Sequence, residues 1–297
     1  MKRAAFIGLG VMGFPMAGHL RQAGFEVTVY NRSSAKAEAW VARFGGNSAA
    51  TPREAALGAD IVCICVGNDD DLRSVVLGPD GALEGLVAGA LCVDHTTASA
   101  KVARELHQSC AEKGVGFIDA PVSGGQAGAE NGVLTIMCGG DLEAFERAKP
   151  CLESYSRSLR LLGPPGSGQL AKMVNQICIA GIVQGLAEAI NFSETVGLNT
   201  AEVIDVISKG AAQSWQMENR YQTMLEDHYN HGFAVDWMRK DLGMVEAVAD
   251  EHQIPIPVAR LVNEFYADVQ AMGGGRWDTS SLLRRLQALT EKDARGQ

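Results

Sequence analysis

The chain has 297 residues, a hydrophobic share of 46% and a formal net charge of −9. This length suits one large domain or two of ordinary size, and this composition supplies a sizeable core. The negative charge argues against nucleic-acid binding through a basic surface, and every apolar stretch of spanning length has polar interruptions, which argues against a membrane partner.

The cysteines and histidines indicate a reducing environment and no metal site. Seven cysteines occur without a CxxC pair, mostly among apolar residues, as core-filling thiols do. His228 and His231 form an HxxH pair without further ligands at a convincing spacing. The basic N-terminus meets Gly8 before an apolar region of signal-peptide length can form. We therefore expect a cytoplasmic protein without bound metal.

Strand and helix patterns alternate through the first half of the chain. Thr51-Pro-Arg-Glu54 is a capping box with proline at the first helical position. The near-continuous apolar run 61–66 is typical of a strand buried on both faces. Strands that alternate with helices predict an α/β domain with a doubly wound parallel sheet. The strands are expected at 3–7, 26–30, 60–66, 90–94, 116–119, 133–138 and 158–162.

Beyond the glycine- and proline-rich segment 163–168 the pattern becomes helical only. The sequence therefore predicts an α/β domain over 1–163 and an all-α domain over 164–297. The helices are expected at 169–196, from 200, and at 236–251, 257–272 and 279–289.

Gly8, Gly10 and Gly13 follow the first strand and open a helix. The first glycine allows a tight turn, the second lets the backbone approach a pyrophosphate, and the third lets helix and strand pack closely. A bare GxGxxG is a weak signal because glycines also occur in ordinary turns, but its place between strand and helix predicts dinucleotide binding.

The end of the second strand indicates which dinucleotide is bound. NAD enzymes usually carry a carboxylate there for the ribose 2′-hydroxyl, whereas this chain has Tyr30-Asn31-Arg32-Ser33-Ser34. Arginine can neutralise a 2′-phosphate, and Asn and Ser can donate to it. Arg32 could instead be an ordinary exposed cation; its position favours NADP(H) over NAD(H).

Two further segments carry candidate chemistry. Asp119-Ala-Pro-Val-Ser123-Gly124-Gly125 follows a strand end, where a serine hydroxyl and flexible backbone can bind an anion, although a plain turn is the simpler interpretation. Lys172 stands near the start of a long apolar helix, and Asn175 shares its helical face. Such a lysine is more often a snorkelling surface residue, but a dinucleotide enzyme has a clear use for a positioned amine.

Four motifs follow one another along the chain: Gly8-Leu-Gly-Val-Met-Gly-Phe-Pro-Met16, Asp119-Ala-Pro-Val-Ser-Gly-Gly125, Gly163 through Lys172 to Asn175, and Lys240-Asp-Leu-Gly243. In this order they resemble the β-hydroxyacid dehydrogenase family, which includes 3-hydroxyisobutyrate dehydrogenases and NADPH-dependent glyoxylate and succinic semialdehyde reductases. The resemblance extends over nearly the whole chain and implies an N-terminal Rossmann domain followed by an all-helical domain for substrate binding and oligomerisation.

The resemblance also assigns roles to individual residues. It implies that Lys172 is catalytic and that Asp241 supports the site. It implies substrate binding by Ser123, Gly124, Gly125, Asn175 and Thr97. It implies cofactor binding by Gly8, Leu9, Gly10, Val11, Met12, Gly13, Asn31, Arg32, Ser33, Val66, Thr97, Phe233 and Lys240.

The predicted protein is thus an NADP(H)-dependent oxidoreductase that acts on a small carboxylate. It would interconvert a semialdehyde of the glyoxylate or succinic semialdehyde type and its hydroxy acid, as a homodimer or homotetramer. 3-Hydroxyisobutyrate dehydrogenase and tartronate semialdehyde reductase activities are close alternatives. An imine reductase or a non-catalytic nucleotide-binding scaffold is disfavoured, because related imine-reducing enzymes commonly lack this lysine and a scaffold would not need Lys172.

Overall fold

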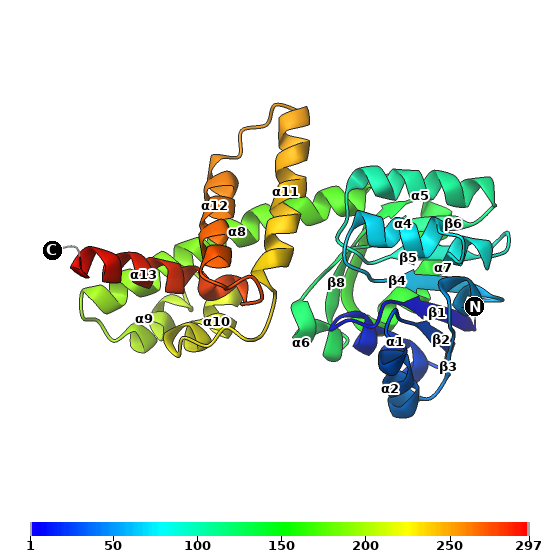
Figure 1. Cartoon of the computed structure of the whole chain (residues 1–297), viewed down its shortest axis with the longest axis horizontal. Coiled ribbons are helices and arrows are strands. Elements are labelled where there is room, and N and C mark those ends of the chain that lie inside the picture. The colour runs from blue at the N-terminus through cyan, green and yellow to red at the C-terminus, as the bar shows by residue number, and fades with distance from the viewer. Residues whose placement is uncertain (1, 296–297) are drawn as a thin grey trace. The chain divides into compact units, whose positions relative to one another are not determined.

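In the computed structural model, which describes residues 2–295, the chain forms two compact units (Figure 1). The first unit ends at Lys172 and the second begins at Met173. The sequence placed this boundary nine residues earlier, after residue 163. The difference arises because the long helix α8 (Ser167–Thr195) begins within the first unit, where its first turn is bonded to the sheet.

The first unit is built on one sheet with the strand order β3-β2-β1-β4-β5-β6-β8-β7, and β9 pairs with β8. Neighbouring strands from β3 to β6 pair in parallel. The strands are β1 (Arg3–Ile7), β2 (Glu26–Tyr30), β3 (Asn47–Ser48), β4 (Ile61–Ile64), β5 (Leu91–Asp94), β6 (Gly116–Asp119), β7 (Val122–Ser123), β8 (Leu134–Gly140) and β9 (Ser156–Leu161).

One edge of the sheet departs from the predicted parallel arrangement. β8 runs antiparallel to β6 and to the short strand β7, which the sequence did not predict. Only the segment 120–133 connects β6 to β8, and its helix α6 (Gly125–Glu130) has six residues. A parallel return needs a longer crossover along the sheet, so the chain re-enters from the carboxyl edge. The sheet is therefore parallel in its larger part and mixed at this end.

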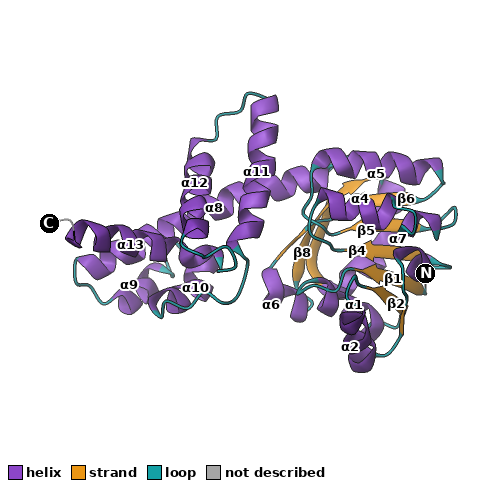
Figure 2. Ribbon diagram, in the orientation of Figure 1, coloured by secondary structure: helices purple, strands orange, loops and turns teal. Residues whose placement is uncertain are grey.

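The alternation of side chains along the strands produces two cores, one on each face of the sheet. Phe6 and Cys63 pack with Met16, Trp40 and other residues of one core. The neighbouring Ile7 and Ile64 enter the other core, which contains residues of α4 and α5. Both faces are therefore apolar and covered by helices, as Figure 2 shows for the orange strands and purple helices of this unit.

The helices of the first unit lie between these strands in sequence. Thr51 caps α3 by accepting a hydrogen bond from the Glu54 amide at 3.1 Å, as the capping box predicted. The helices are α1 (Gly13–Gln22), α2 (Ser34–Phe44), α3 (Pro52–Ala56), α4 (Asp69–Leu77), α5 (Ala100–Glu112), α6 and α7 (Leu142–Leu152), with 3₁₀ turns η1 (Ala82–Glu84) and η2 (Glu153–Tyr155).

The described part of the second unit is helical, apart from an isolated bridge between Ala234 and Asp278. Its core gathers Ala180, Val183 and Ile190 of α8 with apolar residues from the other helices. Helix α10 was not predicted, although Met217, Tyr221, Met224 and Leu225 have the spacing of one helical face and pack in or against this core. The helices after α8 are α9 (Thr200–Ile207), α10 (Trp215–Leu225), α11 (Val235–Glu251), α12 (Pro257–Ala271), η3 (Thr279–Ser281) and α13 (Leu282–Arg295).

Helix α8 is, within the described residues, the one helix whose length and composition alone would allow it to cross a membrane. Its mean hydropathy over the most apolar window is 1.4. Ala180, Val183 and Ala187 are nevertheless buried inside the helical unit, which is the usual situation of a long core helix.

Candidate active site

The glycine turn between β1 and α1 is packed too closely for any side chain at two of its three positions. A methyl group on Gly8 would lie 2.1 Å from the Cys65 carbonyl oxygen, and one on Gly13 would lie 1.9 Å from the Gly8 oxygen. Gly8 also has a positive φ of 95°. A methyl group on Gly10 would meet nothing within 4 Å, so the backbone there is open to a ligand. The turn therefore fits a dinucleotide pyrophosphate at the start of α1.

Asn31 holds the loop after β2 against this turn. Its Oδ1 accepts a hydrogen bond from the Leu9 amide at 2.9 Å, and its Nδ2 donates to the Ser33 carbonyl oxygen at 3.1 Å. The sequence pointed to a possible phosphate donor at this position. In the structure, both polar atoms of the Asn31 amide take part in fixing the backbone on which Arg32 stands.

Arg32 extends from that loop with 91% of its side chain exposed. Its Nη1 lies 3.8 Å from the Asp71 Oδ1, a weak surface ion pair. Asp71 belongs to the first turn of α4, together with Asp69 and Asp70. The guanidinium is therefore accessible to an anion, but it already lies beside the Asp71 carboxylate, which the sequence alone had not placed there.

The loop that follows β5 is fixed by bonds from side chains to backbone. The Thr96 hydroxyl accepts from the Val66 amide at 3.0 Å, and the Thr96 amide donates to the Asp94 Oδ1 at 2.9 Å. Thr97, next along this loop, is half-buried. The structure thus brings the β4 and β5 ends, with Val66 and Thr97, to the same edge of the sheet.

His95 has a structural role that the sequence did not reveal. Its ring is 1% exposed, with Nδ1 2.7 Å from the Ala120 oxygen and Nε2 2.8 Å from the Tyr155 hydroxyl. The ring also stacks on Phe6 at a centroid distance of 6.4 Å. These contacts link the end of β5 to β6 and η2, and they stabilise the loop in which Thr97 stands.

Ser123 ends β7, and Gly124 and Gly125 begin α6. Both glycines have positive φ angles, 131° and 62°, which favour glycine. Ser123 is half-buried and both glycines are exposed, so the hydroxyl and nearby backbone are accessible. The exposure of this segment leaves room for a small anion, and its role in substrate binding stays a prediction.

Two buried residues join the beginning of α8 to the sheet. The Asp119 carboxylate, at the end of β6, accepts hydrogen bonds from the Gly166 amide at 2.8 Å and the Gln169 amide at 3.0 Å. The Gln169 side chain accepts from the Ala98 amide at 3.1 Å and donates to the Thr96 oxygen at 2.8 Å. The sequence analysis missed Gln169. The signal was a glutamine beside a turn in an otherwise apolar helix.

Burial changes the acid–base properties of this edge. Desolvation raises the pKa of Asp94 to about 7 despite its hydrogen bonds from Thr96, and its buried Oδ2 has no hydrogen-bond partner among residues 2–295. Desolvation also raises the pKa of Asp119, although the amides of Gly166 and Gln169 oppose this effect. The two residues are partners in the β5–β6 register, so their negative charges disfavour each other.

Lys172 is 8% exposed, one turn after Gln169 on the same face of α8. Asn175 is half-buried another turn on, and its Nδ2 donates to the Gln176 Oε1 at 2.8 Å. Lys172 is therefore buried at the start of the helix. It is not the snorkelling surface lysine that the sequence analysis considered as the alternative.

In the second unit, Asp241 and Lys240 form a polar group on α11. Gln176 of α8 donates to the Asp241 Oδ2 at 2.6 Å, and the Lys240 Nζ lies 3.4 Å from the Asp241 Oδ1. Lys240 also lies 5.5 Å from the centre of the Trp237 ring. Phe233 precedes this helix, with its amide donating to Asp278. Gln176, which the sequence analysis also missed, links Asn175 to this group.

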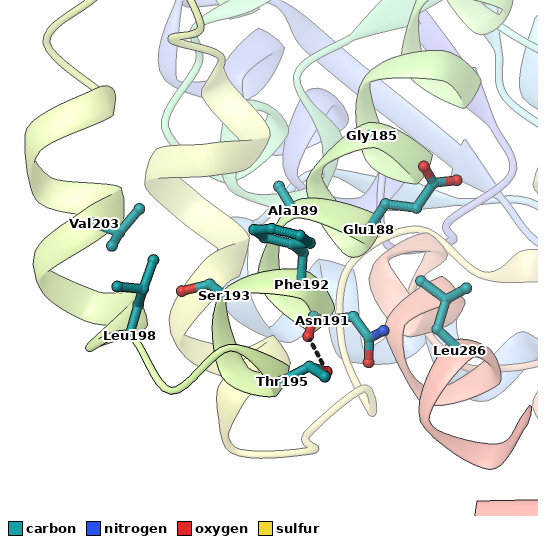
Figure 3. A pocket seen from close by; sticks show the side chains of 10 residues that line it. All are labelled: Gly185, Glu188, Ala189, Asn191, Phe192, Ser193, Thr195, Leu198, Val203 and Leu286. Carbon is teal, nitrogen blue, oxygen red and sulfur yellow. Dashed lines mark hydrogen bonds between the residues drawn. The ribbon is translucent and has the colours of Figure 1, made fainter. Parts of the chain in front are cut away.

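A separate groove of about 790 Å³ lies at the other end of α8 (Figure 3). Its lining is mainly apolar, and Phe192 and Leu198 are strongly exposed. None of the candidate site residues contributes to it. The lining residues are Gly185, Glu188, Ala189, Asn191, Phe192, Ser193, Thr195, Leu198, Val203 and Leu286.

Comparison with known proteins agrees with this geometry. Residues 3–163 match the family described as the NAD binding domain of 6-phosphogluconate dehydrogenase. Residues 166–286 match the family described as NAD-binding of NADP-dependent 3-hydroxyisobutyrate dehydrogenase. The two matches meet at the turn before α8.

Individual relatives cover almost the whole chain. An uncharacterized oxidoreductase of Shewanella frigidimarina is 62% identical over 97% of this chain and 99% of its own length. An NAD-dependent L-serine dehydrogenase of Pseudomonas aeruginosa is 34% identical over 94% and 96%. The crystal structure of a 3-hydroxyisobutyrate dehydrogenase from Salmonella typhimurium superposes with a TM-score of 0.86 at 29% identity, covering 96% of this chain and 99% of that one.

These matches extend over both units, and they agree with the glycine turn, the Rossmann sheet and the helical second unit. The enzyme class follows from them, since the relatives are named as oxidoreductases and dehydrogenases. The chain is therefore an NAD(P)-binding oxidoreductase of the β-hydroxyacid dehydrogenase family, acting on the CH–OH group of its substrate.

Proposed function

We propose that the protein transfers a hydride between NADP(H) and a short carboxylate semialdehyde, of the glyoxylate or succinic semialdehyde type, to form the hydroxy acid. The observation that carries this proposal is the buried Lys172, held at the start of α8 where that helix is bonded to the ends of β5 and β6. Ligands bind at this carboxyl edge in open α/β sheets, so an amine here is suited to act on a bound carbonyl.

The nicotinamide, when bound, supplies or accepts the hydride. Hydride addition leaves negative charge on the carbonyl oxygen, and the Lys172 ammonium donates a proton to that oxygen. In the reverse direction the neutral amine takes the hydroxyl proton. Ser123 and the backbone of Gly124 and Gly125 bind the carboxylate, and Asn175 orients the reacting oxygen from the same face of α8 as Lys172.

A second candidate is the oxidation of a 3-hydroxy acid such as 3-hydroxyisobutyrate or L-serine. The Pseudomonas aeruginosa relative, named an L-serine dehydrogenase, supports this candidate. The same residues would act, with Lys172 as the base.

The two candidates are compared by measuring kcat/KM for a panel of substrates. The panel contains semialdehydes, including tartronate semialdehyde, and 3-hydroxy acids, each tested with NADPH/NADP⁺ and with NADH/NAD⁺. Glyoxylate or succinic semialdehyde with NADPH should give the highest value, and a clear preference for a 3-hydroxy acid would favour the second candidate.

Replacement of Lys172 by alanine should lower kcat by about 10²–10⁴-fold, the usual contribution of a general acid. Lys172→Arg should lower kcat to a similar extent, because arginine keeps the charge but does not release a proton near neutral pH. Lys101→Ala, at an exposed lysine of α5, is the matched control. Fluorescence titration should show that NADPH still binds. Near-normal turnover by either Lys172 variant would contradict the assignment.

Arg32 and Asp71 should change cofactor preference in opposite directions. A charge-assisted contact to the 2′-phosphate is worth about 10–100-fold in affinity, so Arg32→Ala should lower the NADPH/NADH ratio of kcat/KM by about this factor. Asp71→Asn removes a carboxylate that competes for the guanidinium, and should raise that ratio about 2–5-fold, as expected for an exposed pair. Arg157→Ala, in β9, serves as the control. If the wild type preferred NADH, or if Arg32→Ala left the NADPH/NADH ratio of kcat/KM unchanged, Arg32 would not determine the cofactor preference.

Ser123→Ala should raise KM for the acid about 10-fold while leaving NADPH affinity nearly unchanged, because a hydrogen bond to a carboxylate is lost. The substrate carboxylate itself should be required: an aldehyde of equal length with a neutral end should react poorly, since the site's donors would be left unpaired. Ser158→Ala, on exposed β9, should change neither constant. Equal kcat/KM on charged and neutral aldehydes would contradict the proposed carboxylate binding and would favour the imine-reductase alternative again.

We also propose that the groove on α8 is a contact between copies of the chain, in a homodimer or homotetramer. Phe192 projects with 66% of its surface exposed, and the small residues Ala189 and Gly185 lie three and seven positions before it (Figure 3). A projecting ring and a hollow over small residues on one helix face are the parts that a two-fold contact requires, since each copy can fill the other.

Phe192→Glu should therefore shift the protein toward the monomer, because it places a charge in the centre of the apolar contact. Light scattering after gel filtration, over a range of protein concentrations, measures the mass. Leu142→Glu is a control at a similarly exposed apolar residue, 65% exposed, of the first unit. A monomeric wild type, or an unchanged mass in Phe192→Glu, would contradict the contact.

A further inference from the structure

We propose that Gln169 is a positioning residue that fixes the catalytic lysine relative to the loop that presents Thr97. This inference rests on the proposed role of Lys172 and deepens it. Gln169 lies in the first turn of α8 and is 1% exposed. Its backbone and its side chain together bond to two different strand ends, those of β5 and β6.

The side-chain amide of Gln169 bonds to the backbone on both sides of Thr97. Its Oε1 accepts from the Ala98 amide at 3.1 Å, after Thr97, and its Nε2 donates to the Thr96 oxygen at 2.8 Å, before Thr97. All of these atoms are in a buried environment. The side chain thereby closes the loop and satisfies two backbone groups that have no strand partner there.

Only a side chain with one donor and one acceptor at this reach satisfies both groups. An ionised glutamate can accept from Ala98 but cannot donate to the Thr96 oxygen, and it would place two acceptors against each other. An alanine would leave a buried donor and a buried acceptor without partners. Asparagine is one methylene shorter. The chemistry of the loop therefore explains why a glutamine occupies this position.

The same residue determines where Lys172 stands. Gln169 and Lys172 are three positions apart on one face of α8, so a rotation or shift of the helix start moves both. The Gln169 amide also donates to Asp119. A methyl group on Gly139 would lie 2.7 Å from the Gly168 nitrogen, and one on Gly168 would lie 2.6 Å from the Asp119 carbonyl oxygen, so the helix start is closely packed. The helix turn that carries Lys172 is thus held at a fixed place relative to Thr97. Proton transfer requires this, because a displacement of about 1 Å costs on the order of 10²-fold in rate.

The decisive variant is Gln169→Glu, compared with wild type across pH 6–9. Burial raises the pKa of the new carboxyl, and the protonated form regains a donor for the Thr96 oxygen. We expect kcat of the variant to be about 10–100-fold below wild type at high pH, and the ratio to wild type to recover as pH falls. The NADPH dissociation constant should stay within about threefold. Gln108→Glu, at an exposed glutamine of α5, should give a ratio near one at every pH.

A pH-independent ratio for Gln169→Glu, or an unchanged kcat, would overturn the positioning role. A uniform loss at every pH with a lowered thermal transition would show that Gln169 only stabilises the fold, and would equally overturn it. Both outcomes are distinct from the expected one, because the recovery at low pH depends on the protonation of one introduced group.

A second measurement needs neither substrate nor turnover. Hydrogen–deuterium exchange of the protein without cofactor should show faster exchange of the Ala98 amide in Gln169→Ala than in wild type, with Gln108→Ala unchanged. Unaltered protection of Ala98 would contradict the closure of the loop by Gln169. If wild type turned over none of the acids tested, the proposed function would fail, whereas the exchange experiment would still decide whether Gln169 holds the loop.

Discussion

The structure of the sheet edge that carries the candidate site depends on one buried carboxylate, that of Asp119. It ends β6 and accepts two amide hydrogens, from Gly166 and Gln169, at the start of α8. A helix start has unpaired N–H groups and a partial positive charge, so it is a suitable partner for a carboxylate that cannot be hydrated. Burial still raises the pKa of Asp119, which shows that these bonds only partly offset desolvation. The position of Lys172 follows from this contact, since it fixes where α8 begins.

Around this carboxylate, side chains hold the loops at the sheet edge in addition to the last backbone bonds between strands, such as that from the His95 amide to the Ile64 oxygen. Thr96, His95 and Gln169 each bond to backbone atoms of a neighbouring strand end. Parallel strands leave such groups unpaired where they end, and buried groups of this kind need partners. The partners are buried and hydrogen-bonded, so the edge is formed without a ligand. A preorganised site of this kind loses less entropy when its substrate binds.

In the loop after β2, the exposed cation Arg32 lies beside a carboxylate. Asn31 braces the loop by its bonds to Leu9 and Ser33, which leaves Arg32 as the cation directed at solvent. Asp71 lies beside it on α4, and the exposure of both side chains to water keeps this pair weak. A 2′-phosphate would compete with Asp71 for the same guanidinium.

The sequence by itself determined what is local. Strand bounds at Arg3–Ile7 and Glu26–Tyr30, the glycine turn and the Thr51 cap follow from spacing and from backbone sterics, so neighbouring residues suffice to predict them. The tertiary structure decided the antiparallel β8, the pair of Arg32 with Asp71, and the partners of Gln169, which lie 71 and 73 residues away. Glutamine in an apolar helix signals only that a partner exists. Which partner it finds depends on strand order and helix placement, because burial brings together groups that no sequence spacing relates.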